Sequence, residues 1–268
     1  MPKHNLTAAT LAVAACSSAA LADGYAASVV DYTSGTLTNA AYDDPNAALG
    51  GLVADTGFGI LNPFNPPFAT SDIVEVGVGG SLTLQLETPA DTGGLGLGIH
   101  AAVGLVDQDG DFGNNDAFTG SPVYTFDTDP TFGPGPRAAV VSVSDDGQNF
   151  VSLGRVEFLL PSNVDAGAAG PLDSADTIDD PADPFQPFDA SLQDFANRDF
   201  AGVLDLLAGS AGGTWLDLSG TGLAEVNFVR FDGVQAGERF FLDSVVSVPE
   251  PASLSAFAFA ALLLRRRR

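Results

Sequence analysis

The sequence predicts an all-β protein that folds as a single antiparallel β-sandwich with long acidic loops. The 268 residues include 31 glycines and 17 prolines, and the aromatic residues are mostly Phe, a composition typical of turn-rich β domains. Short runs of alternating or β-branched residues recur along the chain, whereas no repeat of 20 to 50 residues is visible. We therefore expect one body, residues 23–247, between terminal segments 1–22 and 248–268.

The first two strands that the sequence predicts lie on either side of a pair of glycines. Residues 73–78 and 81–86 flank Gly79 and Gly80, a pattern typical of a β-hairpin. In the segment "SLTLQLE", Leu82, Leu84 and Leu86 alternate with polar residues, which predicts one buried and one solvated face. The apolar, glycine-rich residues 95–106 that follow predict a buried strand.

Two further hairpins and little helix are expected in the second half. Residues 138–144 and 150–159 flank "DDGQ", and residues 224–231 and 239–248 flank "DGVQAGE". Ser191 is a suitable cap for a short segment through Asp194, and residues 200–207 have helical spacing of apolar side chains. The acidic stretch that contains Pro181 and Pro184 predicts a disordered surface loop.

The N-terminus has the organisation of a secretory signal peptide. A basic start is followed by an apolar run at residues 6–15 and by Ala20 and Ala22 just before Asp23, which predicts cleavage after Ala22. A second interpretation stays open, because "VAAC" resembles a bacterial lipobox in which Cys16 would be lipidated. Cleavage after Ala22 leaves a mature body without cysteine, which excludes disulfides.

The body is strongly acidic. Between Asp23 and Val248 there are 33 acidic residues, five arginines and no lysine. Such a surface repels nucleic acid, whose phosphates require clustered Lys and Arg, and it attracts cations. The alternative interpretation is a solvated surface that keeps the protein soluble.

The C-terminus combines a rigid motif, an apolar run and a basic cluster. Prolines make residues 248–251 stiff and extended, and the 13 residues 252–264 would form a helix about 20 Å long. A hydrocarbon core is about 30 Å thick, so this segment is short for a span, and snorkelling arginines recover part of the difference. The basic cluster stays cytoplasmic by the positive-inside rule. Alternatively, the segment is an amphiphilic helix packed on the body.

These three parts resemble the PEP-CTERM sorting signal of exported bacterial proteins. The motif is Val248, Pro249, Glu250 and Pro251, and the basic cluster is Arg265, Arg266, Arg267 and Arg268. The resemblance implies signal peptidase and an exosortase as partners, transient membrane insertion through the C-terminal helix, and removal of the tail.

The order of segments in the body resembles a recurring exported domain of the discoidin or galactose-binding type. The segments are "AAYDDPNAALGG", "DIVEVGVGGSLTLQLE", "VSVSDDGQNFVSLG" and "VNFVRFDG". The resemblance implies a jelly-roll sandwich, and a carbohydrate-binding module is the alternative function that it suggests, with extracellular polysaccharide as the partner.

The sequence offers no catalytic set. The mature body has one histidine, His100, and no cysteine, and no motif for a nucleophile, a phosphate loop or a zinc protease is present. We expect His100 to face out of an apolar strand rather than to act as a base. An extracellular hydrolase is accordingly the weakest functional class.

One acidic turn predicts a calcium site. The segment "DQDGDFGNND" places Asp107, Asp109, Asp111 and Asp116 close together in a loop, and Ca²⁺ prefers six to eight such oxygen ligands. The spacing differs from that of an EF-hand, and an ordinary acidic turn is the open alternative. The expected function is that of a non-enzymatic, exported protein of the cell surface or extracellular matrix.

Overall fold

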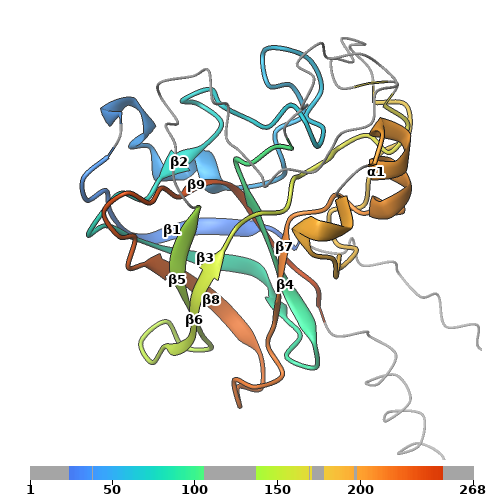
Figure 1. Ribbon diagram of the computed structural model, residues 1–268. Helices are drawn as coiled ribbons and strands as arrows, with labels where there is room; N and C mark the ends of the chain where they lie inside the picture. Colours follow the sequence, from blue (N-terminus) through green and yellow to red (C-terminus); the bar gives the residue numbers. More distant parts are fainter. Residues whose placement is uncertain are drawn as a thin grey trace, which may run out of the picture.

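The computed structural model describes residues 24–37, 39–105, 137–168, 170, 178–195 and 198–249. Two antiparallel β-sheets lie face to face in it (Figure 1), which confirms the all-β, sandwich-like fold. The five-stranded sheet contains, in spatial order, β1 (Ala26–Thr33), β3 (Ser81–Ala90), β8 (Val226–Asp232), β5 (Ala138–Ser144) and β6 (Val151–Glu157). The four-stranded sheet contains, in spatial order, β2 (Val74–Glu75), β9 (Phe241–Ser247), β4 (Leu95–Ala101) and β7 (Thr214–Asp217).

The main hydrophobic core fills the space between the sheets. Leu82, Leu84 and Leu86 are almost fully buried in it, as their alternation predicts. Phe240 stacks there against Phe158 and Phe231, with ring centroids 4.5 Å and 5.0 Å away. Residues from both sheets thus meet in one cluster, and this burial is the main favourable term for a fold of this class.

One of the three expected hairpins is confirmed. Strands β5 and β6 pair antiparallel through a turn that begins at Ser144. The Asp146 carboxylate organises this turn, accepting hydrogen bonds from the backbone N–H groups of Gln148 and Asn149 at 2.8 Å. These bonds hold the pKa of Asp146 below its usual value.

The hairpin predicted around Gly79 and Gly80 is wrong, because β2 and β3 belong to different sheets. Residues 77–80 form a corner at which two backbone segments cross. A Cβ on Gly77 would lie 2.3 Å from the Thr36 carbonyl oxygen, and one on Gly80 would lie 2.5 Å from that of Ser34. The glycines are therefore required by close backbone approach rather than by a hairpin turn.

The hairpin predicted between residues 224–231 and 239–248 is also wrong. Strand β8 lies in the five-stranded sheet and β9 in the other. The seven residues of "DGVQAGE" exceed the usual two to five of a hairpin loop. Here they carry the chain across the sandwich, and Val234 is buried on the way.

A second layer covers the outer face of the four-stranded sheet. Helix α1 (Phe200–Leu207) and the 3-10 helix Leu192–Phe195 belong to it, and both occur where the sequence predicts helix. Asp199 caps α1 by accepting a hydrogen bond from the Gly202 N–H at 2.8 Å. The layer forms a second hydrophobic cluster of buried residues: Phe64, Leu160, Ala168, Phe188, Phe195, Phe200, Val203, Leu207, Trp215 and Val246.

The described part of the acidic loop that contains Pro181 and Pro184 is ordered, so the prediction of a disordered loop is wrong there. Asp165, which is 2% exposed, accepts hydrogen bonds from the backbone N–H groups of Asp179 and Asp180. Bridges also join Asp165 to Pro181 and Asp183 to Ser210. A buried carboxylate thus fixes this loop to the second layer.

The sandwich has two different ends. Three connections lie at one end, the lower end in Figure 1: between β3 and β4 (residues 91–94), between β5 and β6 (residues 145–150) and between β7 and β8 (residues 218–225). The first and last described residues, Gly24 and Pro249, belong to this end, because Ser247 is bonded to Gly24 and Val248 to Asp91 and Gly96. We call it the exit end, and the opposite end, with the connection between β8 and β9, the far end.

Candidate functional site

The two ends of the body are joined to each other. Gly24 accepts two hydrogen bonds through its carbonyl oxygen, from the Ser247 N–H at 2.5 Å and from the Ser247 hydroxyl at 3.0 Å. The same hydroxyl lies 2.7 Å from the carbonyl oxygen of Thr88 in β3. Tyr25 continues the contact through an isolated bridge to Val246. The first residues of the body therefore complete the edge of the last strand, β9.

Gly24 is required at this position. A Cβ there would lie 2.3 Å from the Ser247 carbonyl oxygen and 3.0 Å from the ring of Phe185. Real Cβ atoms do not approach backbone oxygen so closely, and the backbone on both sides is held by other bonds. Glycine thus permits the two chain ends to lie in contact.

Val248 is the first residue of the predicted sorting motif and the last that the body holds by hydrogen bonds on both sides. Its N–H donates to the Gly96 carbonyl oxygen at 2.9 Å, and its own carbonyl oxygen accepts from the Asp91 N–H at 2.8 Å. Its side chain packs against the second hydrophobic cluster. Pro249, the next residue, is half-buried. The motif therefore follows the last strand without a spacer.

The remaining predicted site residues lie outside the described residues, so those predictions stay predictions. They are the cleavage-site residues Ala20, Ala22 and Asp23, the motif residues Glu250 and Pro251, the basic residues Arg265, Arg266, Arg267 and Arg268, and the calcium candidates Asp107, Asp109, Asp111 and Asp116. Within the described ranges, no group of three acidic, histidine or cysteine side chains is placed to hold a metal ion. No helix in those ranges is long and apolar enough to cross a membrane.

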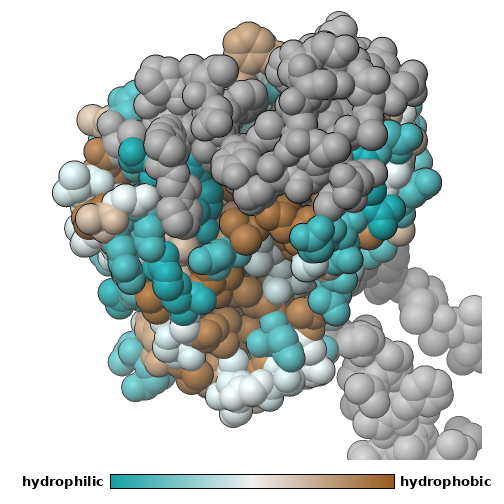
Figure 2. Space-filling model, viewed as in Figure 1, coloured by the Kyte–Doolittle hydropathy of each residue, from teal (hydrophilic) through white to brown (hydrophobic). Residues whose placement is uncertain are grey.

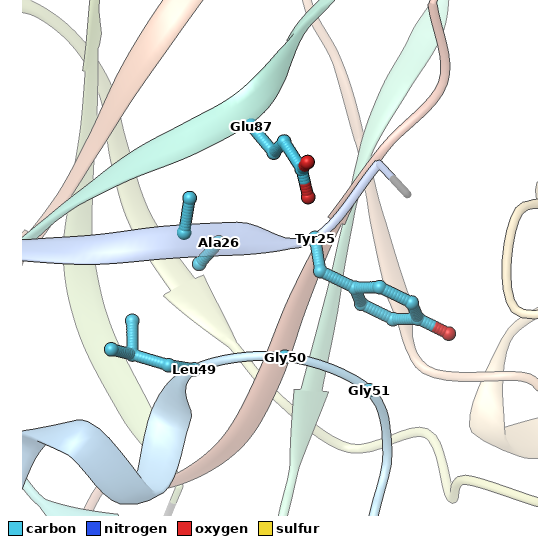
Figure 3. A pocket seen from close by; sticks show the side chains of 7 residues that line it. Tyr25, Ala26, Leu49, Gly50, Gly51 and Glu87 are labelled. Carbon is cyan, nitrogen blue, oxygen red and sulfur yellow. The ribbon is translucent and has the colours of Figure 1, made fainter. Parts of the chain in front are cut away.

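A shallow open pocket lies beside the joined ends. It has a volume of about 640 Å³ and is lined by Tyr25, Ala26, Ala27, Leu49, Gly50, Gly51 and Glu87. Figure 3 shows the Tyr25 ring and the Glu87 carboxylate around the start of β1, with residues 49–51 running alongside. The Gly50 N–H donates to the Ala26 carbonyl oxygen at 3.1 Å, which fixes this wall. The pocket thus combines an aromatic ring, one carboxylate and exposed backbone.

The body also contains a serine–histidine pair, and it is sealed from solvent. His100 Nδ1 lies 2.9 Å from the Ser162 hydroxyl, and the two residues are 0% and 3% exposed. The expectation that His100 faces outward is therefore wrong. Ser162 covers its side of β4, and a Cβ on Gly213, just before the neighbouring strand β7, would lie 2.8 Å from the imidazole ring. A nucleophile must be able to reach its substrate, and this buried pair cannot. The contact instead links strand β4 to the segment that contains Ser162.

Asp243 is a buried carboxyl that sequence reasoning missed. It is 2% exposed, and its Oδ1 accepts a hydrogen bond from the Val53 N–H at 3.3 Å. Burial, the largest cause, raises its pKa well above 3.8, and the nearby Asp72 raises it further. The sequence does contain a signal for its burial, because Asp243 is the one acidic residue inside the mainly apolar run "FFLDSVVS". Asp243 is thus protonated in the folded body over a pH range in which the unfolded chain has lost this proton.

No family model, no curated protein and no solved structure matches this chain.

The first prediction concerns the joined ends. Replacing Gly24 with Ala should destabilise the body by about 1 to 3 kcal/mol, because the added methyl group forces the two backbone segments apart. Gly94→Ala is the matched control, since its Cβ would meet no atom within 4 Å. Urea unfolding of the two variants measures the difference. Equal stability of Gly24→Ala and Gly94→Ala would show that the ends are not tightly joined.

The second prediction concerns pH. Burial lowers the pKa of His100 from 6.5 to about 3, so its contribution to stability is present above pH 6.5 and is lost as the pH falls toward 3. Asp243 has the opposite effect. Because its folded pKa is raised, its contribution is present below pH 3.8 and is lost as the pH rises toward the folded value.

Around pH 5 the two groups change the free energy of unfolding with pH in opposite directions, and the slope from His100 approaches about 1.4 kcal/mol per pH unit. Asp243→Asn should therefore reveal a loss of stability with falling pH, and His100→Gln a loss with rising pH. Urea unfolding between about pH 4.5 and 5.5 measures both slopes, and the double variant gives the contribution of the other groups. Slopes in the single variants that match the double variant would contradict the burial of both groups.

Proposed function

We propose that this chain is an exported protein of the cell surface or extracellular matrix that is sorted through a PEP-CTERM signal and has a non-enzymatic, structural or adhesive role. The observation that carries the proposal is the position of the motif. The last residue held by the body on both sides, Val248, is the first residue of the Val-Pro-Glu-Pro sequence. The proposed signal therefore starts at a residue that the body still holds, and removal of the residues after it would leave the bonds of Val248 in place.

Other features support this proposal. The leader ends at Ala22, two residues before Gly24, so a cut after Ala22 leaves every contact of Gly24 in place. The serine–histidine pair is sealed within the body, which supports a non-enzymatic role. In this proposal the body is a jelly-roll sandwich, residues 1–22 are a signal peptide, and residues 252–264 form a hydrophobic helix in the membrane.

The proposed partners are signal peptidase and an exosortase. The first cleaves between Ala22 and Asp23, and the second recognises the motif and removes the tail while the protein is held transiently in the inner membrane. The mature body then reaches the cell surface or the matrix around extracellular polysaccharide.

The third prediction tests the sorting step. Changing Pro249 and Glu250 to Ala together should leave the protein exported but still carrying the C-terminal tail, because the stiff extended motif is lost while the leader and body are unchanged. Mass spectrometry of the exported protein measures both ends. A wild-type product that retains Arg265, Arg266, Arg267 and Arg268 would contradict the proposal, and a lipid-modified Cys16 at its start would contradict the leader assignment.

A carbohydrate-binding module of the galactose-binding-like type is the second candidate, and the pocket beside the joined ends favours it. Sugar sites pair an aromatic face with a few polar groups, and the pocket offers the Tyr25 ring and the exposed Glu87 carboxylate.

The fourth prediction tests this candidate. On a glycan array, a body with this activity should bind a defined set of sugars, and Glu87→Ala should weaken the binding by about tenfold or more, as expected for a lost hydrogen bond to a charged group. Glu225→Ala, at another exposed glutamate, is the control. An array without bound sugars, or equal binding by the two variants, would exclude the pocket as a sugar site.

A further inference from the structure

We propose that the exit end of the sandwich is the surface that faces the lipid bilayer while the C-terminal tail is held in the membrane. This inference rests on the proposed sorting role and adds the orientation of the body to it. The far end, with the corner at residues 77–80 and the connection between β8 and β9, then faces away from the membrane.

The attachment point fixes the orientation. Val248 is bonded to Asp91, in the connection between β3 and β4, and to Gly96, at the start of β4. Only residues 249–251 separate it from the apolar run that begins at Ala252. Four residue steps span at most about 14 Å even when fully extended. Strand β8 alone carries the chain about 20 Å from the exit end to the far end, so the tether is shorter than the sheet to which it is attached.

The N-terminus leaves the body at the same place. Gly24 is hydrogen-bonded to Ser247, and the apolar leader ends only two residues earlier. A precursor whose leader is uncut would therefore be attached to the bilayer by both ends at one surface. Cleavage of the leader removes one attachment without changing which end of the body faces the lipid.

The exit end is held near the bilayer by this tether and not by attraction. Its three connections carry four acidic side chains and no basic one, namely Asp91, Asp145, Asp146 and Glu225. Figure 2 shows mostly hydrophilic or near-neutral residues along this lower end. Anionic lipids repel such a surface within a Debye length, about 10 Å at 0.1 M salt. The exit end should therefore lie farther from a bilayer of anionic lipid at low salt, and closer to it when salt screens the charges.

The absence of cysteine from the mature chain makes the orientation measurable. Ala224 and Ala236 are both exposed and lie just beyond opposite ends of β8. Ala224→Cys and Ala236→Cys, each in the chain of residues 23–268, place a fluorescent label at the exit end and at the far end. The labelled chains are reconstituted into phosphatidylcholine vesicles that contain a headgroup-attached quencher, and a second set also contains phosphatidylglycerol.

The label at position 224 should be quenched several-fold more strongly than the label at position 236, and with phosphatidylglycerol its quenching should increase with added NaCl. A chain that ends at Pro249 should show quenching of neither label. Ser219→Cys and Gln235→Cys, which are also exposed, form a second pair in case a first variant folds poorly.

Failure of the inference and failure of the proposed function give different results. If the full chain floats with the vesicles but both labels are quenched equally, or the label at position 236 is quenched more, the orientation is overturned while membrane insertion stands. If the full chain does not float with the vesicles, the membrane step of the proposed function is overturned and the orientation falls with it.

Discussion

The fold depends on the contacts that pair both edges of its last strand, β9. All seven residues of β9 are buried, and the strand lies between β4 on one side and, on the other, β2 and the bridge from Tyr25. The first and last residues of the body must therefore be present together before the four-stranded sheet can close. Strand β9 contributes Leu242 and Val245 to the main core and Val246 to the second cluster, so neither hydrophobic cluster is complete without it. A body built in this way cannot close until its C-terminal strand is available, and long-range pairing of this kind forms slowly.

The closure of this sheet also determines where the two ends of the body lie. The same contacts that complete β9 place Gly24 next to Ser247 and bond Val248 to the body on both sides. In the proposed function, the leader ends just before Gly24 and the sorting motif begins at Val248. A sorting enzyme of the proposed kind would therefore act directly beside folded backbone. The second layer contributes to the same boundary, since Val248 packs on its hydrophobic cluster. Folding of the body thus holds Val248, the first residue of the proposed motif, in the sheet.

Local sequence patterns predicted the elements better than their connections. The alternation of leucines with polar residues identified β3, and the glycine-rich apolar run identified β4. The helical spacing of apolar side chains identified α1 at residues 200–207. The turn at Asp146 was recognised because its hydrogen bonds are local. The glycines at residues 77–80 were misread, since a hairpin turn and a close backbone crossing require the same residue type. The burial of His100 was missed because it depends on residues distant in sequence, and β1 was missed because "AASVVDYT" lacks clear alternation.

Hydrogen exchange at the last strand tests the account most directly. The amides of Ser247 and Val248 donate to Gly24 and Gly96, so in the mature body they should open only when the whole fold opens. The account predicts that the free energy of opening at these two amides equals the free energy of global unfolding measured with urea. Opening at a small fraction of the global free energy, as at a frayed chain end, would contradict the claim that the joined ends close the fold.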